Sequence, residues 1–293
     1  MKKWSILFLA FASTLSYARE VSSSEIITTK VVETEMLKIL GTVDNKTTLS
    51  VSGENALLSF EMASPPQYSI RIYNYSTLKV ENGGSINMNS ANDSYGNIQL
   101  NGYTTFLIES TAGTIYTDKI AFASANCVLT INKANAIQSC SADVPYVYLT
   151  LPSSGTLNLN ASHAFNMDIR AGVVPTFKFA NGAVLSIMGW KGSAAEESMK
   201  LVDFVDYSIF LSDGDKDDIV YALEDNLLTI TQGKSVKKVS ILDADGSAFE
   251  GLALHATEGG YFLASATAVP EPAEWAMIFG GIALAFAIYR RRK

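Results

Sequence analysis

Residues 76–100, STLKVENGGSINMNSANDSYGNIQL, decide the fold of this chain. They contain three short runs in which apolar and polar side chains alternate, and Asn, Gly and Ser separate these runs. The runs are Leu78-Lys79-Val80, Ile86-Asn87-Met88 and Ile98-Gln99-Leu100. An alternation of period two places the apolar side chains on one face of a strand, and Asn and Gly accept the tight backbone of a corner. The stretch therefore predicts short, half-buried β-strands joined by tight turns.

The same alternation recurs along most of the chain. Further runs are Leu49-Ser50-Val51, Ile70-Arg71-Ile72, Leu129-Thr130-Ile131, Leu157-Asn158-Leu159, Phe177-Lys178-Phe179 and Leu185-Ser186-Ile187. Several runs follow a glycine, but the glycines at positions 84, 96, 113, 155 and 182 are unevenly spaced. A β-solenoid accommodates uneven corners better than a Greek-key sandwich does. We therefore predict an all-β fold of the parallel β-helix type, with a β-sandwich or jelly roll as the alternative.

The character of the sequence changes near Trp190. Residues 191–199 are polar, and the strand patterns after them are longer and more acidic. An open end strand is a template for aggregation, so a solenoid needs a terminal cap. We predict a solenoid body over residues 19–190, followed by a C-terminal β cap or a small separate β domain over residues 191–268.

The first 18 residues have the form of a secretory signal peptide. Lys2-Lys3 precede an apolar run over residues 4–15, and Ser16-Tyr17-Ala18 supplies the small residues of a cleavage site. We expect cleavage after Ala18, with the Sec machinery and signal peptidase as partners.

The last residues, 269–293, have the form of a membrane tether. Pro270, Glu271 and Pro272 precede an apolar span over residues 275–289, and the chain closes on a basic stop made of Arg290, Arg291, Arg292 and Lys293. Basic residues beside a membrane span are retained in the cytoplasm. Because about 20 apolar residues are needed to cross a bilayer, this short transmembrane helix suits a temporary tether.

This tail resembles the PEP-CTERM sorting signal of Gram-negative bacteria. The resemblance rests on Pro270-Glu271-Pro272, on the Gly280-Gly281 pair and on the basic end, and it covers residues 269–293 alone. It implies export, brief anchoring in the inner membrane, processing near Pro-Glu-Pro by an exosortase-type membrane peptidase, and delivery to the cell surface or to an extracellular matrix of exopolysaccharide. An ordinary C-terminal anchor is the alternative.

The part of the chain between leader and tail is acidic. Two of the 22 Lys and Arg lie in the leader and four in the tail, and two of the 29 Asp and Glu lie in the tail. The remaining 16 against 27 give this body a net charge of about −11. Since phosphate binding needs clustered Lys and Arg, we exclude nucleic acid as a partner.

One acidic segment resembles a calcium loop. Asp213, Asp215, Asp217 and Glu224 occupy the first, third, fifth and twelfth positions, which supply carboxylate ligands in such loops. The sixth position, where the bend favours Gly, is Asp218. Calcium is therefore the one cofactor that the sequence suggests, and the alternative is a solvated acidic hairpin turn.

The two cysteines, Cys127 and Cys140, would reach an oxidising compartment on export. A disulfide between them would remove unfolded-state entropy worth about 3 kcal/mol. The alternative is two buried thiols that act as small apolar side chains.

The sequence predicts no catalytic residue. The only histidines, His163 and His255, lie outside any nucleophile, zinc or paired-carboxylate motif, and His163 is expected at a corner. The enzyme alternative is a polysaccharide lyase or hydrolase that uses Asp168, Arg170 and Lys178 along one strand face.

The favoured function is a structural or adhesive surface protein associated with polysaccharide. Aromatic side chains that could stack on sugar rings, or equally form core and cross-strand pairs, are Tyr68, Tyr73, Tyr75, Tyr95 and Trp190.

Overall fold

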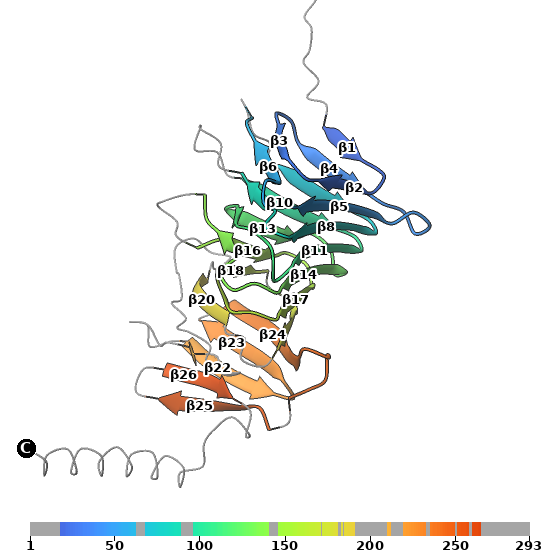
Figure 1. Ribbon diagram of the computed structural model, residues 1–293. Helices are drawn as coiled ribbons and strands as arrows, with labels where there is room; N and C mark the ends of the chain where they lie inside the picture. The colour runs from blue at the N-terminus through green and yellow to red at the C-terminus, as the bar shows by residue number, and fades with distance from the viewer. Residues whose placement is uncertain are drawn as a thin grey trace, which may run out of the picture.

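The structure is a computed structural model that describes residues 18–62, 68–88, 96–140, 146–170, 172–180, 183, 185–190, 210–211, 219–232, 235–249, 251–257 and 260–264. All regular elements in these ranges are β-strands, which confirms the all-β prediction (Figure 1). No helix in these ranges is long and apolar enough to cross a membrane. Residues 1–17 of the predicted leader and the whole of the predicted tail lie outside the described residues.

Sheet A has eight strands, and all its neighbouring strands are parallel. Its order is β1 (Arg19–Val21), β4 (Leu37–Leu40), β7 (Ile70–Tyr73), β10 (Asn97–Asn101), β13 (Lys119–Phe122), β16 (Tyr148–Leu151), β18 (His163–Ile169) and β20 (Leu185–Trp190).

Sheet B has ten strands, of which the first eight are parallel. Its order is β2 (Glu25–Ile27), β5 (Thr47–Ser52), β8 (Ser76–Glu81), β11 (Thr104–Ile108), β14 (Cys127–Ile131), β17 (Thr156–Leu159), β19 (Thr176–Phe179), β24 (Ser235–Asp243), β23 (Leu227–Gln232) and β22 (Ile219–Glu224). The last two pairings, β24 with β23 and β23 with β22, are antiparallel.

Sheet C has five parallel strands, β3 (Lys30–Glu33), β6 (Leu57–Phe60), β9 (Ser85–Asn87), β12 (Ile115–Tyr116) and β15 (Ile137–Gln138). Sheet D is antiparallel and contains β21 (Phe210–Leu211), β26 (Gly260–Ala264) and β25 (Ala253–Thr257).

From β1 to β15 the chain visits sheets A, B and C in turn, five times. We call one such set of three strands a coil. Each strand pairs with the strand that occupies the same place in the next coil, so successive coils lie side by side, as Figure 1 shows. Sheets A and B continue past β15 through β16, β17, β18 and β19, and β20 extends sheet A further.

The apolar members of the alternating runs face a common core between the sheets. In sheet B they form one row in register, with every member at most 3% exposed: Leu49, Leu78, Phe106, Leu129, Leu157, Phe177 and Ile241. Burial of such a side chain contributes about 1.5–3 kcal/mol. The period-two alternation of the sequence therefore separates a continuous core from the outer faces of the sheets.

At the first coil, charged side chains from the three sheets form ion pairs with one another. Arg19 of sheet A forms ion pairs with Glu25 of sheet B and with Glu33 of sheet C. Burial by itself lowers the pKa of the Arg19 guanidinium, but hydrogen bonds and attraction from Glu33 and Glu25 outweigh it and raise that pKa. Since its three members come from sheets A, B and C, this cluster joins the three sheets at the first coil, and Glu33 is buried within it.

Among the described residues β15 is the last strand of sheet C, and His163 covers part of that edge. The Ile137 N–H donates to His163 Nε2 at 3.1 Å, and the Asn135 N–H donates to Ser162 O at 3.1 Å. The His163 ring stacks on Phe165 with centroids 4.5 Å apart, and the imidazole is 4% exposed. The expected corner position was therefore wrong, because this residue begins β18 with its side chain facing the core.

Sheet B runs across the predicted boundary after residue 190. β24, at residues 235–243, pairs in parallel with β19, and β23 and β22 then fold back against it. The Lys237 ammonium of β24 donates to Ile169 O at 2.6 Å, at the end of β18. Burial lowers the pKa of this ammonium, while the Asp168 carboxylate opposes the effect.

Candidate functional site: the outer face of sheet B

The polar members of the alternating runs line the outer face of sheet B in register. One row follows the ends of five neighbouring strands, with one side chain from each: Ser52, Glu81, Glu109, Asn132 and Asn160. The strands are about 4.8 Å apart in a parallel sheet. The row therefore repeats hydrogen-bonding groups at a short, regular interval.

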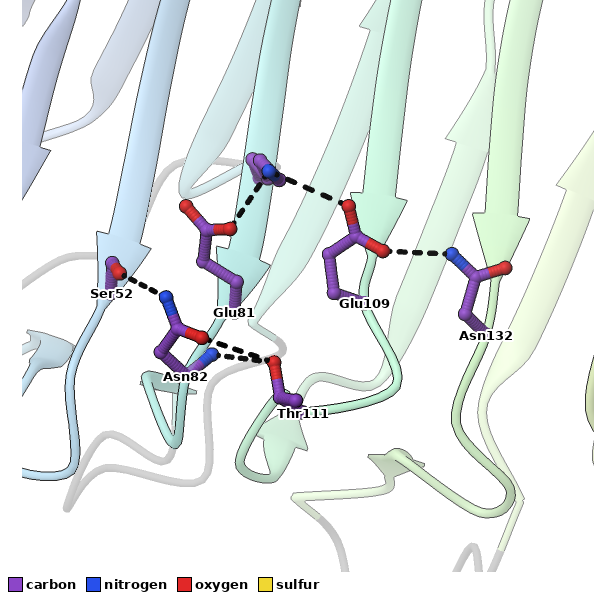
Figure 2. A network of polar contacts seen from close by, with 7 residues as sticks. Ser52, Glu81, Asn82, Glu109, Thr111 and Asn132 are labelled. Atoms are coloured by element: carbon purple, nitrogen blue, oxygen red, sulfur yellow. Dashed lines mark hydrogen bonds and ion pairs between the residues drawn. The ribbon is translucent and has the colours of Figure 1, made fainter.

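Lys79 links two side chains of this row, and direct hydrogen bonds extend the chain of contacts to two more. Its Nζ lies 2.8 Å from Glu81 Oε2 and 3.4 Å from Glu109 Oε1. Asn132 Nδ2 donates to Glu109 Oε2 at 3.1 Å, and Asn160 Nδ2 donates to Asn132 Oδ1 at 2.7 Å. Figure 2 shows Glu81, Glu109 and Asn132 in succession on neighbouring strands. We call Lys79, Glu81, Glu109, Asn132 and Asn160 the polar ladder.

The polar ladder remains open to water. The side chains of Lys79, Glu81 and Glu109 are 27%, 23% and 33% exposed. The hydrogen bond to Glu81 raises the pKa of the Lys79 ammonium, burial opposes this, and Glu109 adds to the rise, so the ammonium stays charged. Exposed ion pairs contribute at most about 1 kcal/mol to stability. These groups are therefore available to a ligand at little cost to the fold.

A second set of contacts lies at the corner where sheet B leads to sheet C. Asn82 Nδ2 donates to Ser52 Oγ at 3.1 Å, and the Asn82 N–H donates to Thr111 Oγ1 at 2.9 Å (Figure 2). Asn82 has a φ of 52°, a left-handed conformation that Asn adopts more readily than most residues. The corners of three successive coils are thus joined by side-chain hydrogen bonds.

Hydroxyl and amide groups lie nearer the starts of the strands on this face, interrupted by the apolar Val128 and Leu107. One row in register is Thr48, Thr77, Thr105, Val128, Thr156 and Thr176. Beside it, Asn158 Nδ2 donates to Thr130 Oγ1 at 3.1 Å. Hydroxyl and amide groups both donate and accept hydrogen bonds. This part of the face therefore presents groups that can both donate and accept hydrogen bonds.

The predicted aromatic residues lie in three settings. Tyr68 is buried, and Arg71 and Lys119 lie over its ring at 5.4 and 5.9 Å from the centroid. Tyr73 accepts a hydrogen bond from Arg71 Nη1 at 3.4 Å. Tyr75 stacks on Tyr103, a residue that sequence reasoning missed. Tyr95 and the side chain of Trp190 lie outside the described residues.

The predicted charged face of Asp168, Arg170 and Lys178 does not form. Asp168 belongs to β18 of sheet A, Arg170 follows that strand, and Lys178 belongs to β19 of sheet B. The chain turns the corner between the two sheets after Arg170, so the side chains of Asp168 and Lys178 lie on different faces. Sequence spacing could not reveal this corner.

The predicted calcium ligands are only partly described. Glu224 is exposed and ends β22, and Asp225 and Asn226 follow with φ values of 46° and 63°, as in a hairpin turn. The other three ligands, Asp213, Asp215 and Asp217, lie outside the described residues. Within the described ranges, no group of three His, Cys, Asp or Glu side chains could hold a metal ion.

The two cysteines are free thiols, so the predicted disulfide is not formed in the structure. Cys127 begins β14 in sheet B, whereas Cys140 follows β15 in sheet C. The buried Cys127 thiol donates to Leu100 O at 3.1 Å. Burial, with the nearby Asp118 carboxylate, raises the pKa of the Cys140 thiol to about 12.

No family model, curated protein or solved structure matches this chain.

Proposed function

We propose that this protein is a non-enzymatic, exported surface protein whose β-solenoid body binds extracellular polysaccharide through the outer face of sheet B. The observation that carries the proposal is the register of that face. Four successive coils and the following strand β17 each contribute one member to the row from Ser52 to Asn160, and the threonine row lies on the same face, four residues earlier along the chain.

The strand pairing supports a solenoid rather than a sandwich. Sandwiches and jelly rolls are built from antiparallel strands. Here all neighbours in sheets A and C and the first eight strands of sheet B are parallel, and the chain visits the three sheets in turn. The antiparallel β22, β23 and β24 at the end of sheet B support the predicted cap.

The charge of the body favours a neutral or weakly charged polymer. With a net charge of about −11 between leader and tail, the body repels strongly acidic polymers at low ionic strength. On the outer face of sheet B, Lys79 neutralises part of the charge of Glu81 and Glu109. Neutral hydroxyl and amide groups supply most of the remaining hydrogen-bonding capacity.

Export rests on the two ends of the chain. β1 begins at Arg19, directly after the expected cleavage at Ala18, so a processed chain would keep every described strand. The tail that resembles the PEP-CTERM signal supplies the route through the inner membrane, with the exosortase-type peptidase as the processing partner. Mass determination of the C-terminus in material released by the host tests this route. A cut beside Pro270 supports it, and an intact tail on released protein contradicts it.

Binding is tested by co-sedimentation of the exported protein with the capsular polysaccharide of its host, together with measurement of polysaccharide chain length. We expect retention without shortening. Because each lost hydrogen bond is worth about 1 kcal/mol, Asn132→Ala combined with Asn158→Ala should weaken retention about thirtyfold. Gln138→Ala, an exposed amide on sheet C, is the matched control and should leave retention unchanged. Shortening of the polysaccharide would instead support the lyase or hydrolase alternative.

A further inference from the structure

Two tyrosines stack at the corner where sheet A leads to sheet B. Tyr75 directly precedes β8 and Tyr103 directly precedes β11, which is the neighbouring strand of sheet B. Their ring centroids are 5.0 Å apart, and their planes differ by 5°. Tyr103 is 55% exposed, and Tyr75 is half-buried. The pair is therefore an aromatic surface in contact with water and is not part of the core.

The backbone at this corner is held in an uncommon conformation. Asn74 and Tyr75 have φ values of 21° and 53°. A left-handed conformation costs about 1–2 kcal/mol for a residue with a side chain, and it is rarer for a bulky residue than for Asn. Strained residues of this kind persist where the surrounding structure holds them, and they gather at ligand sites.

The surrounding contacts hold the corner. The Asn74 N–H donates to Asn101 O at 3.0 Å, and the Gly41 N–H donates to Asn74 O at 3.1 Å. Gly102 has a φ of 77°, and a Cβ there would lie 2.2 Å from Asn74 Oδ1. A side chain at position 102 would have to displace the Asn74 carboxamide and would be strained by the positive φ, so glycine is favoured directly before Tyr103.

Two serines lie at the same edge between sheets A and B, farther along the stack of strands. Ser124 Oγ donates to Gly102 O and accepts from the Gly102 N–H, both at 2.8 Å, and Ser153 Oγ donates to Ala123 O at 3.2 Å. Along the strands, Tyr75 and Tyr103 stand two residues before Thr77 and Thr105 of the threonine row. The aromatic pair thus borders the outer face of sheet B on the side opposite the polar ladder.

We propose that Tyr75 and Tyr103 form a ring-stacking subsite for a pyranose with equatorial hydroxyls in a neutral β-linked glycan. Such a sugar presents a flat face of C–H groups that packs on an aromatic ring, and a tyrosine adds a hydroxyl that hydrogen-bonds at the rim. The neighbouring threonine row would accept the hydroxyls of the same chain. This proposal rests on the proposed polysaccharide binding and assigns the aromatic contact within it.

The test uses the full chain in mild detergent, with cellohexaose and the host capsular polysaccharide as probes, and measures affinity by calorimetry and by co-sedimentation. Tyr103→Ala should weaken binding of both probes about fivefold, because a stacked ring contributes on the order of 1 kcal/mol. Tyr103→Phe keeps the ring and should bind within about twofold of the natural protein. Tyr116→Ala removes a 37%-exposed tyrosine from sheet C and is the matched control.

The outcomes separate the two proposals. If the natural protein binds polysaccharide and Tyr103→Ala binds equally well, the subsite is refuted and the proposed function stands. If the natural protein binds neither probe, both proposals are refuted. If Tyr103→Ala and Tyr116→Ala weaken binding equally, the effect is not specific to the corner, and the subsite is refuted as well. Thermal unfolding of each variant shows whether a loss of binding reflects a loss of fold.

Discussion

Acidification should destabilise this protein through His163. In the folded chain the imidazole accepts the Ile137 N–H at Nε2, and Nδ1 lies 2.9 Å from Ala164 O. Burial lowers the pKa of His163 from 6.5 to about 4, although the backbone contacts at Ala164 and Ile137 oppose the fall. The neutral ring with its proton on Nδ1 satisfies both contacts, whereas a protonated Nε2 cannot accept the Ile137 bond.

The sign and size of the effect follow from these two pKa values. As the pH falls below 6.5, the unfolded chain binds a proton on His163 before the folded chain does, so the free energy of unfolding decreases. The decrease continues to about pH 4 and levels off below it, and the contribution is fully present above about pH 7. Because one pKa unit corresponds to about 1.4 kcal/mol, the fall from 6.5 to about 4 costs about 3 kcal/mol.

Urea unfolding of the natural protein and of His163→Gln between pH 4 and pH 8 measures this term. Glutamine keeps an acceptor and does not titrate in this range, so the variant carries the acid response of the carboxylates alone. We expect the natural protein to lose about 3 kcal/mol more than the variant between pH 7.5 and pH 4. His163→Leu leaves the Ile137 N–H without its acceptor and should cost about 1–3 kcal/mol at pH 7.5. Parallel pH profiles for the natural protein and His163→Gln would refute the reasoning.

Three further substitutions test the packing by urea unfolding at neutral pH. Phe106→Ala should cost about 3–5 kcal/mol because it leaves a cavity at a fully buried position of the sheet B row, and a loss below about 1 kcal/mol would mean that this row is not the core. Gly84→Ala should cost more than about 2 kcal/mol because its Cβ would lie 2.1 Å from Val51 O. The control is Gly172→Ala, which has φ +78° and no atom within 4 Å of the added Cβ and should cost only about 1 kcal/mol. Equal losses in the two variants would contradict the close contact at Gly84. Arg19→Met should cost about 2–3 kcal/mol because it leaves the Glu33 carboxylate buried without its ion pair. Adding Glu33→Leu in the same chain should restore most of that loss. If the losses of the two single variants simply add in the double variant, the ion pair is contradicted.

The strands could be predicted from the sequence because their signal is local. In the run Ile98-Gln99-Leu100 the two apolar side chains are fully buried and Gln99 is half-exposed, as the alternation indicates. Neighbouring residues alone indicate which side chains are buried, since successive side chains of a strand point to opposite faces.

Which outward side chains meet one another could not be predicted, because that depends on residues far apart in the chain. Asn82 meets Ser52 and Thr111 across separations of 30 and 29 residues. Because the glycines at the corners are unevenly spaced, no fixed repeat length in the sequence reveals which residues are paired. The role of Tyr103 could not be predicted for the same reason, since its stacking partner Tyr75 belongs to the preceding coil.

The sequence by itself therefore determined that the body is acidic and all-β, with short strands that alternate between a buried and an open face. The tertiary structure decided how those strands are shared among sheets, which placed Asp168 and Lys178 on different faces, put the two cysteines in or beside different sheets, and gathered the polar ladder and the stacked tyrosines on either side of one face. The physical reason is that alternation is set by the local backbone, whereas the position of each corner and the register of each parallel pair depend on hydrogen bonds and packing between coils about 20 to 30 residues apart.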